Sequence, residues 1–269
     1  MTDRVQVELK APVATITLNK PERLNALDVS MWEAIDQAAE AIDAAPDVRV
    51  AVLQGAGGAF CAGLDVKAGS TMSGLDAQRS PAEALPFIRR HLAHLQACFS
   101  RLEACRVPVI GALERVCIGG GLELALCCDV RLAAEGTIFA IPEVQLGIVP
   151  DMGGTQRLPR TIGIGLAKEL IYSGRRIDAG AALRIGLINA VYPAADLSAR
   201  VADLAAEIAA NAPLAVQAAK RSINGTFWRE IGGWLDHEAA EAAGPLLSED
   251  RKEGMRAAAE RKRAHFSGR

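Results

Sequence analysis

The stretch Ile118-Gly119-Gly120-Gly121-Leu122-Glu123 places three consecutive glycines directly before an apolar run that contains one acid. A second glycine-framed turn, Phe60-Cys61-Ala62-Gly63-Leu64-Asp65, precedes it in the chain. Glycine adopts backbone dihedral angles that other residues avoid, and it lets the backbone approach a ligand closely. Two such turns can aim two backbone N–H groups at one carbonyl oxygen, which is the arrangement of an oxyanion hole.

The residues after the triple glycine, 122–126, are typical of the start of a buried helix. The first N–H groups of a helix have no partner within it and form the positive end of its dipole, so they face whatever precedes them. A developing oxyanion suits that position. A triple-glycine turn alone more often reflects close packing than catalysis, and the second turn is what favours catalysis here.

Acidic residues stand beside these turns. Glu123 follows the triple glycine, and a further stretch runs from Ile141-Pro142-Glu143 to Asp151-Met152-Gly153-Gly154-Thr155-Gln156-Arg157-Leu158. Carboxylates next to an oxyanion hole can move protons to and from a substrate. For either glutamate alone, a surface or ion-pair role would be the default interpretation.

The composition favours an α/β protein with a substantial core. The chain has 269 residues, of which 50% are hydrophobic, 23% charged and 4% aromatic, and several Ala-rich stretches are amphipathic. This balance is that of a soluble folded protein rather than a disordered one. The length suits one large domain, or a domain with a helical appendage, and no separate second domain is required.

The charge gives no reason to expect a nucleic-acid or membrane partner, because the net charge is −2 and the isoelectric point is near 6.1. Residues 1–8 lack the order of charged, apolar and small residues that marks a signal peptide, so we expect a cytoplasmic location. The most apolar stretch, 116–134, is interrupted by Glu123, Asp129 and Arg131 and belongs in a core rather than a membrane.

The six cysteines, at positions 61, 98, 105, 117, 127 and 128, include no CxxC pair. We expect reduced, mostly buried thiols rather than a disulfide framework. Cys61 lies in a glycine-framed turn, where a nucleophile is one interpretation. No histidine base is close to it in the sequence, so packing is the expected role.

The sequence lacks the common motifs for nucleotide binding, metal binding and serine hydrolysis. The segment 55–60 starts like a dinucleotide-binding fingerprint, but Phe60 occupies the position of the third glycine. There is no GxxxxGK[ST], HExxH or GxSxG motif. His91 and His94 form a pair without an evident third ligand, so we expect no metal site.

The N-terminal half alternates strands and helices. Segments 5–9 and 14–18 alternate with period two around Pro12 and predict a hairpin. Asp28 or Ser30 can cap a helix that runs to about Ala45. Further strands are predicted at 48–54, 107–113, 130–134 and 138–141, and a loop at 69–86.

The C-terminal half is dominated by helical patterns. Helices are predicted at 162–172, closed by Gly174, and at 178–184, closed by Gly186. Two longer helices are predicted at 196–211 and 213–224. The last stretch, 249–266, mixes bases with acids and alanines, which indicates a solvated helix face or a contact with a phosphorylated cofactor or a neighbouring subunit.

Four segments resemble the enoyl-CoA hydratase/isomerase, or crotonase, family: NKPERLNAL at 19–27, FCAGLDVK at 60–67, IGGGLELAL at 118–126 and PEVQLGIVPDMGGTQRL at 142–158. The resemblance covers nearly the whole chain. It implies a spiral of ββα units at 1–195 and a helical oligomerisation region at 196–269 that builds trimers, commonly paired into hexamers. It also implies that each subunit binds an acyl-CoA thioester.

The resemblance assigns roles to residues already singled out. The backbone N–H groups of Leu64 and Gly120 match the family's oxyanion hole. Glu123 and Glu143 match the two catalytic glutamates of the hydratases, where the first helps to activate a water and the second delivers a proton to the α-carbon.

A second group of residues matches the surface that binds coenzyme A in this family. Arg23, Ala62 and Lys67 lie in the matching segments, although plain surface solvation is an alternative for the two cations. Asp65 is expected to brace the oxyanion turn through local hydrogen bonds. Coenzyme A is part of the substrate, so no separate cofactor is expected.

Asp151 departs from the hydratase pattern. Hydratases usually have glycine at the matching position, whereas dienoyl-CoA isomerases resemble this chain in carrying aspartate and pair it with a glutamate that matches Glu143. Glu123, however, is glutamate as in hydratases, where those isomerases typically have aspartate. Asp151 is therefore a second proton shuttle or a cap for the turn that starts at Gly153.

The sequence favours an enoyl-CoA hydratase that adds water reversibly to 2-enoyl-CoA thioesters. A Δ3,5-Δ2,4-dienoyl-CoA isomerase or another enoyl-CoA isomerase is the alternative. A non-catalytic scaffold that binds acyl-CoA is a third interpretation, because a fold does not determine a function. The presence of both Glu123 and Glu143 argues against the scaffold.

Overall fold

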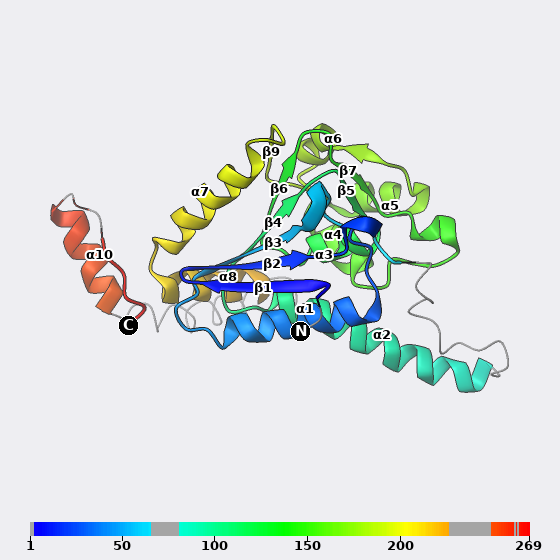
Figure 1. Ribbon diagram of the computed structural model, residues 1–269, viewed down its shortest axis with the longest axis horizontal. Coiled ribbons are helices and arrows are strands. Elements are labelled where there is room, and N and C mark those ends of the chain that lie inside the picture. The colour runs from blue at the N-terminus through cyan, green and yellow to red at the C-terminus, as the bar shows by residue number, and fades with distance from the viewer. Residues whose placement is uncertain (1–2, 66–80, 226–248, 261, 263) are drawn as a thin grey trace.

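The computed structural model describes residues 3–65, 81–225, 249–260, 262 and 264–269. At its centre lies a six-stranded sheet in the order β1-β2-β3-β4-β6-β9. Helices α1 and α2 lie along one side of this sheet, and α7 lies along the other (Figure 1). The protein therefore has the layered α/β architecture that the sequence predicts.

The central sheet is parallel apart from its first hairpin. β1 pairs antiparallel with β2, and every later pair in the sheet is parallel. A second, three-stranded sheet has the order β5-β7-β8. The strands are β1 Val5–Lys10, β2 Val13–Leu18, β3 Val50–Gly55, β4 Val109–Leu113, β5 Val116–Ile118, β6 Val130–Ala134, β7 Ile138–Ala140, β8 Ile177–Asp178 and β9 Ala190–Tyr192.

Helices connect these strands and dominate the C-terminal half. The α-helices are α1 Val29–Asp43, α2 Pro81–Glu103, α3 Gly120–Ala125, α4 Gly154–Ile162, α5 Ile164–Ser173, α6 Ala179–Arg184, α7 Leu197–Ala209, α8 Pro213–Gly225 and α10 Glu249–Glu260. The 3₁₀ helices are η1 Pro21–Arg23, η2 Ala56–Gly58 and η3 Glu143–Leu146. Within the described part of the chain, no helix is long and apolar enough to cross a membrane.

Two hydrophobic clusters hold the layers together. The larger one packs α1 and α2 against one face of the sheet and surrounds the buried helix α3. The smaller one packs α7, through Leu197, Val201 and Ala205, against the opposite face. α7 thus covers the central sheet, while the division into 1–195 and 196–269 and the role of the second part in oligomerisation stay predictions.

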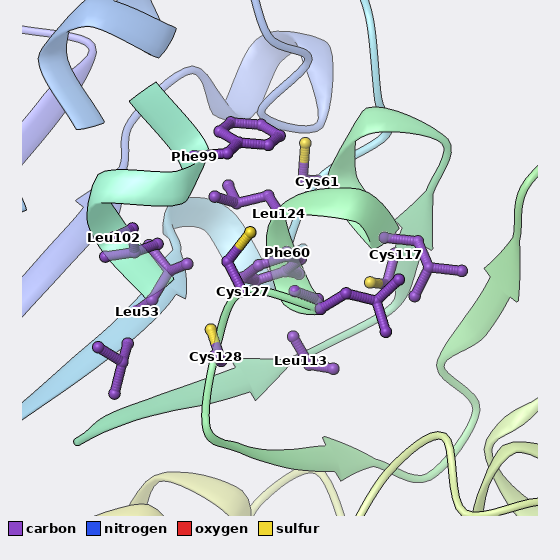
Figure 2. Close-up of a cluster of buried hydrophobic side chains, with 14 of the residues drawn as sticks. Leu53, Phe60, Cys61, Phe99, Leu102, Leu113, Cys117, Leu124, Cys127 and Cys128 are labelled. Atoms are coloured by element: carbon purple, nitrogen blue, oxygen red, sulfur yellow. The ribbon is translucent and has the colours of Figure 1, made fainter. Parts of the chain in front are cut away.

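All six cysteines are free and buried, as expected. Figure 2 shows the sulfurs of Cys61, Cys117, Cys127 and Cys128 among aliphatic and aromatic side chains of the larger cluster. Burial raises the pKa of the Cys61 thiol to about 12, and its sulfur donates to Asn25 O at 3.1 Å. A thiol that keeps its proton is a poor nucleophile, so packing is the role that the structure supports.

Most of the predicted elements are confirmed. The hairpin has the expected alternation, with Val5 opposite Leu18. Asp28 caps α1 by accepting a hydrogen bond from Met31 N at 3.3 Å, whereas Ser30 donates to the same carboxylate. The strands predicted at 48–54 and 107–113 correspond to β3 and β4.

The structure corrects two boundaries and adds three short strands. Residues 66–80 of the predicted loop 69–86 lie outside the described residues, but 81–86 belong to α2, whose prolines at 81 and 86 argued against a helix. The helix predicted at 162–172 is α5, which begins at Ile164 because Gly163, with φ 83°, separates it from α4; its predicted close at Gly174 is confirmed. The short strands β5, β8 and β9 carry too few residues for a periodic pattern.

Candidate active site

The two glycine-framed turns meet in space. Cys61 and Cys117 form a parallel bridge, with Cys61 N donating to Val116 O at 3.0 Å and Ile118 N to Cys61 O at 3.1 Å. Gly63 has φ +92°, and a Cβ built on it would lie 2.7 Å from Ile118 O. Only glycine permits both this conformation and this approach.

The backbone N–H groups of Leu64 and Gly120 lie side by side. Leu27 N donates to Gly63 O, and Leu27 O accepts from Asp65 N, so this parallel bridge leaves the Leu64 N–H facing away from Leu27. Gly120 begins α3, where N–H groups have no partner within the helix. A Cβ on Gly120 would lie 3.9 Å from Leu64 N. The sequence predicted this pairing of donors.

Glu123 projects from α3 into a buried site and is 2% exposed. Its Oε1 accepts hydrogen bonds from Met152 N at 3.0 Å and Gly154 N at 2.8 Å. Burial, followed by the charges of Glu143 and Asp151, raises its pKa to about 8, although the two N–H donors oppose the shift. A Cβ on Gly154 would lie 2.7 Å from the same oxygen, which explains the glycine there.

Glu143 begins η3 and is 7% exposed. Its Oε1 would lie 2.8 Å from a Cβ on Gly119, a residue with φ 55° and ψ −127°. Its Oε2 has no hydrogen-bond partner among the described residues. Burial, with a smaller contribution from the charge of Asp151, raises the pKa of Glu143 to about 7. An unpaired oxygen of a buried acid is available to a ligand.

Asp151 lies in the loop between η3 and α4 and is half-buried, and burial raises its pKa. Its charge raises the pKa of both Glu123 and Glu143, so Asp151 lies within electrostatic reach of both glutamates. Helix α4 has Gly153 as its N-cap and no side-chain capping bond. The interpretation of Asp151 as a cap is therefore wrong, while a role in proton transfer stays a prediction.

The residues matched to the coenzyme A surface are only partly described. Arg23 is exposed in η1, and Ala62 is half-buried with its N–H bonded to Leu24 O at 2.9 Å. Lys67 lies outside the described residues. Asp65 is 7% exposed and pairs with Lys20 Nζ at 2.8 Å. Asp65 thus braces the turn through an ion pair with Lys20, a residue distant in sequence. The sequence led us to expect bracing through local hydrogen bonds instead.

Lys20 is the main site residue that the sequence did not indicate. It is 5% exposed and contacts both Asp28 and Asp65 at 2.8 Å. Its backbone N–H also donates to Asn25 Oδ1 at 2.8 Å. The NKPERLNAL segment contains Lys20, but no spacing in the sequence links it to carboxylates at positions 28 and 65.

A cavity of about 1240 Å³ adjoins this site. Asp151, Gly153 and Arg157 line one of its walls, and α2 and α8 contribute others, whereas Glu123 and Glu143 are not among the lining residues. The buried glutamate pair therefore lies behind the loop at 150–154 rather than inside this cavity. Among the described residues, no cluster of three or more His, Cys, Asp or Glu side chains could hold a metal ion.

The fold and the site define an α/β protein in which two neighbouring N–H donors stand beside two buried carboxyl groups. The model of the enoyl-CoA hydratase/isomerase family matches residues 8–269, and the chain belongs to that family. A short-chain-enoyl-CoA hydratase of Clostridium acetobutylicum is 36% identical over 263 residues, 97% of this chain and 96% of that protein.

Two further similar proteins carry the names of different activities, one an isomerase and one a hydratase. A peroxisomal Δ3,5-Δ2,4-dienoyl-CoA isomerase of Arabidopsis thaliana is 34% identical over 258 residues, 94% of this chain and 91% of that protein. The crystal structure of an enoyl-CoA hydratase from Bacillus anthracis superposes with a TM-score of 0.89 at 34% identity, and covers 99% of this chain and 100% of that one. The family resemblance and the crotonase-like fold expected from the sequence are confirmed.

Proposed function

We propose that this protein is an enoyl-CoA hydratase that adds water reversibly to 2-enoyl-CoA thioesters. The observation that carries the proposal is the pair of buried glutamates, Glu123 and Glu143, each with a pKa raised toward neutrality. Both carboxyl groups lie against the glycine turn at 119–120 or its helix. Acid–base catalysis requires such groups, and a scaffold that only bound a thioester would not.

The oxyanion hole supplies the first catalytic contribution. The Leu64 and Gly120 N–H groups would bind the thioester carbonyl oxygen and stabilise the negative charge that develops on it as the enolate forms. Losing one donor of this kind costs about 2.7–4 kcal/mol of barrier. A substitution of the Leu64 side chain leaves its N–H in place, so the backbone geometry matters more than the side chain.

The two glutamates move the protons. Glu123 accepts a proton from water as the water oxygen bonds to C3 of the enoyl group, and Glu143 delivers its proton to C2. The pair therefore holds one proton before and after the reaction. Because the two groups interact, they titrate as a pair, and near neutral pH the pair carries about one proton.

The N–H donors favour this assignment of roles. Met152 N and Gly154 N stabilise the ionised form of Glu123, while Glu143 Oε2 has no donor among the described residues and suits the protonated form. Deeper burial of Glu123 acts in the opposite direction. A substrate water bound between the two groups would offset part of this burial penalty and so favour the ionised form of Glu123.

The remaining features of the proposal concern binding and assembly. Arg23 and Lys67 would contact the phosphates of coenzyme A, and the backbone at Ala62 would contact its adenine. The reaction needs no cofactor beyond the coenzyme A of the substrate. We further propose a cytoplasmic homotrimer or homohexamer, with the helices of 196–269 in the subunit contacts.

A dienoyl-CoA isomerase is the second candidate, because Asp151 raises the pKa of both glutamates and so lies within electrostatic reach of the same site. In that reaction Asp151 and Glu143 would move protons between carbons, and no water would be added. Glu123, whose carboxylate is fixed by two N–H groups, favours the hydratase.

Incubation of the purified protein with 2-enoyl-CoA and 3,5-dienoyl-CoA esters in separate reactions tests the proposal. Hydration adds the mass of one water to the enoyl ester. An unchanged mass with a shifted diene chromophore would replace the hydratase by the isomerase. Tight binding of acyl-CoA esters of several chain lengths without any chemical change would favour a scaffold.

A further inference from the structure

The loop that holds Glu123 is itself held from outside the site. Arg157, on the first turns of α4, donates from Nη1 to Met152 O at 3.1 Å. Its Nε and Nη2 donate to Glu103 Oε2 at 3.1 and 2.8 Å, and Nη2 also donates to Ser100 Oγ at 3.1 Å. One guanidinium thus joins the loop at 150–154 to the C-terminal part of α2.

A second bond from α2 reaches the same loop. Gln96 Nε2 donates to Asp151 O at 2.6 Å. The Asp151 carbonyl therefore faces α2 and the Met152 carbonyl faces Arg157, while the N–H groups of Met152 and Gly154 point toward Glu123 Oε1 at 3.0 and 2.8 Å. The carbonyl groups of this loop are thus held from outside the site, and its N–H groups hold the carboxylate of Glu123.

The packing of Arg157 leaves little room for other arrangements. The side chain of Arg157 is 14% exposed. A Cβ on Gly153 would lie 2.0 Å from Arg157 Nη1, and Gly153 has φ +99°. A planar guanidinium satisfies a carbonyl, a hydroxyl and a carboxylate at once, which an ammonium group with its single nitrogen cannot do in the same geometry.

We propose that Arg157, with Glu103 and Gln96, is a positioning residue that holds the loop at 150–154 so that its N–H groups fix the carboxylate of Glu123. The inference rests on the proposed function, because it assigns Glu123 a part in proton transfer. Arg157 does not touch the reacting atoms. It acts through Met152, and it connects helix α2 to the catalytic pair.

The charged groups that face Glu123 are Glu143 from η3, Asp151 from the loop, and Arg157 from α4, which is itself paired with Glu103 of α2. If Arg157 acted by charge alone, a lysine would replace it. If Arg157 acts by holding the loop, Arg157→Lys keeps the charge but releases the loop. The N–H groups of Met152 and Gly154 then move away from Glu123, and the pKa of Glu123 rises.

The test compares Arg157→Lys, Arg157→Gln and Gln96→Leu with the unchanged protein. Infrared titration would measure the pKa of the Glu123 carboxyl group, isolated as the difference between each protein and the same protein carrying Glu123→Gln. We expect a raised pKa of Glu123 in all three variants. We also expect kcat for hydration to fall about tenfold to a hundredfold in Arg157→Lys with KM changed less, as for a misplaced catalytic group.

Arg101→Gln is the matched control, because Arg101 lies on α2 near Glu103 but pairs with the partly exposed Asp36 at 2.8 Å. This variant should keep both the kcat and the pKa of Glu123. A folded Arg157→Lys protein with an unaltered pKa of Glu123 would overturn the inference. If instead the unchanged protein turns over no enoyl-CoA, the proposed function fails, and the infrared titration still decides whether Arg157 positions Glu123.

Discussion

Two sets of buried or partly buried carboxylates in this protein have opposite electrostatic surroundings. Asp28 and Asp65 share the ammonium group of Lys20 at 2.8 Å each. Glu123 and Glu143 share a site in which neither forms an ion pair with a described residue, and Oε2 of Glu143 has no hydrogen-bond partner among those residues.

The difference appears in their proton affinities. Lys20, Ser30 and Arg4 overcome the effect of burial and lower the pKa of Asp28 to about 2, whereas burial raises the pKa of Glu123 to about 8 and of Glu143 to about 7. Asp28 is therefore ionised at neutral pH, and its role is structural. The second set changes its protonation near neutral pH, as an acid–base pair must. Burial alone therefore does not make a carboxylate catalytic, and the missing cation is what distinguishes the site.

Glu143→Gln should give the largest effect on activity. The amide fills the same space but cannot deliver a proton to C2, so kcat for hydration should fall by about 10²–10⁴-fold. Steady-state hydration assays on 2-enoyl-CoA measure this, with unfolding curves to show that the protein remains folded. Glu135→Gln, an exposed residue of a turn, is the matched control and should keep full activity. Retained turnover in Glu143→Gln would contradict the role of Glu143.

Lys20→Met should break the structural set instead. It removes the cation that the buried Asp65 shares with the partly buried Asp28, which keeps Arg4, and removing one partner of a buried ion pair costs about 3–5 kcal/mol. Chemical denaturation should show this loss in the free energy of unfolding at pH 7. Lys168→Met, an exposed lysine on α5, should change the stability little. An equally stable Lys20→Met protein would mean that the network contributes no more than the apolar side chain that replaces it.

Gly119→Ala tests how the backbone protects Glu143. A Cβ at this position would lie 2.8 Å from Glu143 Oε1, in a residue with φ 55°. We expect a loss of about 1–3 kcal/mol in the free energy of unfolding and at least a tenfold loss of kcat as Glu143 is displaced.

Gly136→Ala is the matched control for backbone strain. Gly136 has φ +78°, and no atom lies within 4 Å of its built Cβ. This variant should lose stability through strain alone and keep its kcat. Equal kinetics for the two variants would show that Glu143 does not depend on the glycine.

The two sets should give opposite dependences of stability on pH. The pKa of Glu143 is raised on folding from 4.5 to about 7, so its contribution to the free energy of unfolding falls as pH rises through that interval. The pKa of Asp28 is lowered from 3.8 to about 2, so its contribution to the same free energy is lost as pH falls from 3.8 to 2. Each group changes the free energy of unfolding by at most about 1.4 kcal/mol per pH unit.

Denaturation curves at a series of pH values would measure both limbs. Glu143→Gln should flatten the limb between pH 5 and 7 and leave the acid limb, and Asp28→Asn should do the reverse. The same slope in Glu143→Gln and the unchanged protein would show that Glu143 has an ordinary pKa in the folded state.

Local patterns in the sequence predicted much of the fold. The hairpin, α1 with its cap at Asp28, and the parallel strands β3, β4 and β6 follow from alternation, capping chemistry and apolar runs. Helix α2 was hidden because Pro86 lies inside it. Pro81 takes the first helical position, where a missing N–H costs little, but Pro86 lies one turn further in, where a proline removes a helix hydrogen bond and therefore indicates a helix break in a sequence.

The site was predictable where the motif itself carries the geometry. Leu64, Gly120, Glu123 and Glu143 come together because the glycine turns force their neighbours into contact. The supporting contacts were not predictable. Lys20 and Asp65 are 45 residues apart, and Gln96 and Asp151 are 55 residues apart, so only the packing of α2 and of the 20–28 segment shows that they meet.

Asp151→Asn should have the smallest effect if the protein is a hydratase. The substitution removes a charge that raises the pKa of both glutamates, so the pH profile of kcat/KM should move toward lower pH while kcat on 2-enoyl-CoA changes less than about tenfold. Rates measured across pH on 2-enoyl-CoA and 3,5-dienoyl-CoA check this. A loss of about a hundredfold or more on the dienoyl ester would identify Asp151 as a base in isomerisation. Asp151 and Glu143 would then be the two groups that transfer protons. Glu123 would raise the proton affinities of these two groups instead of activating a water.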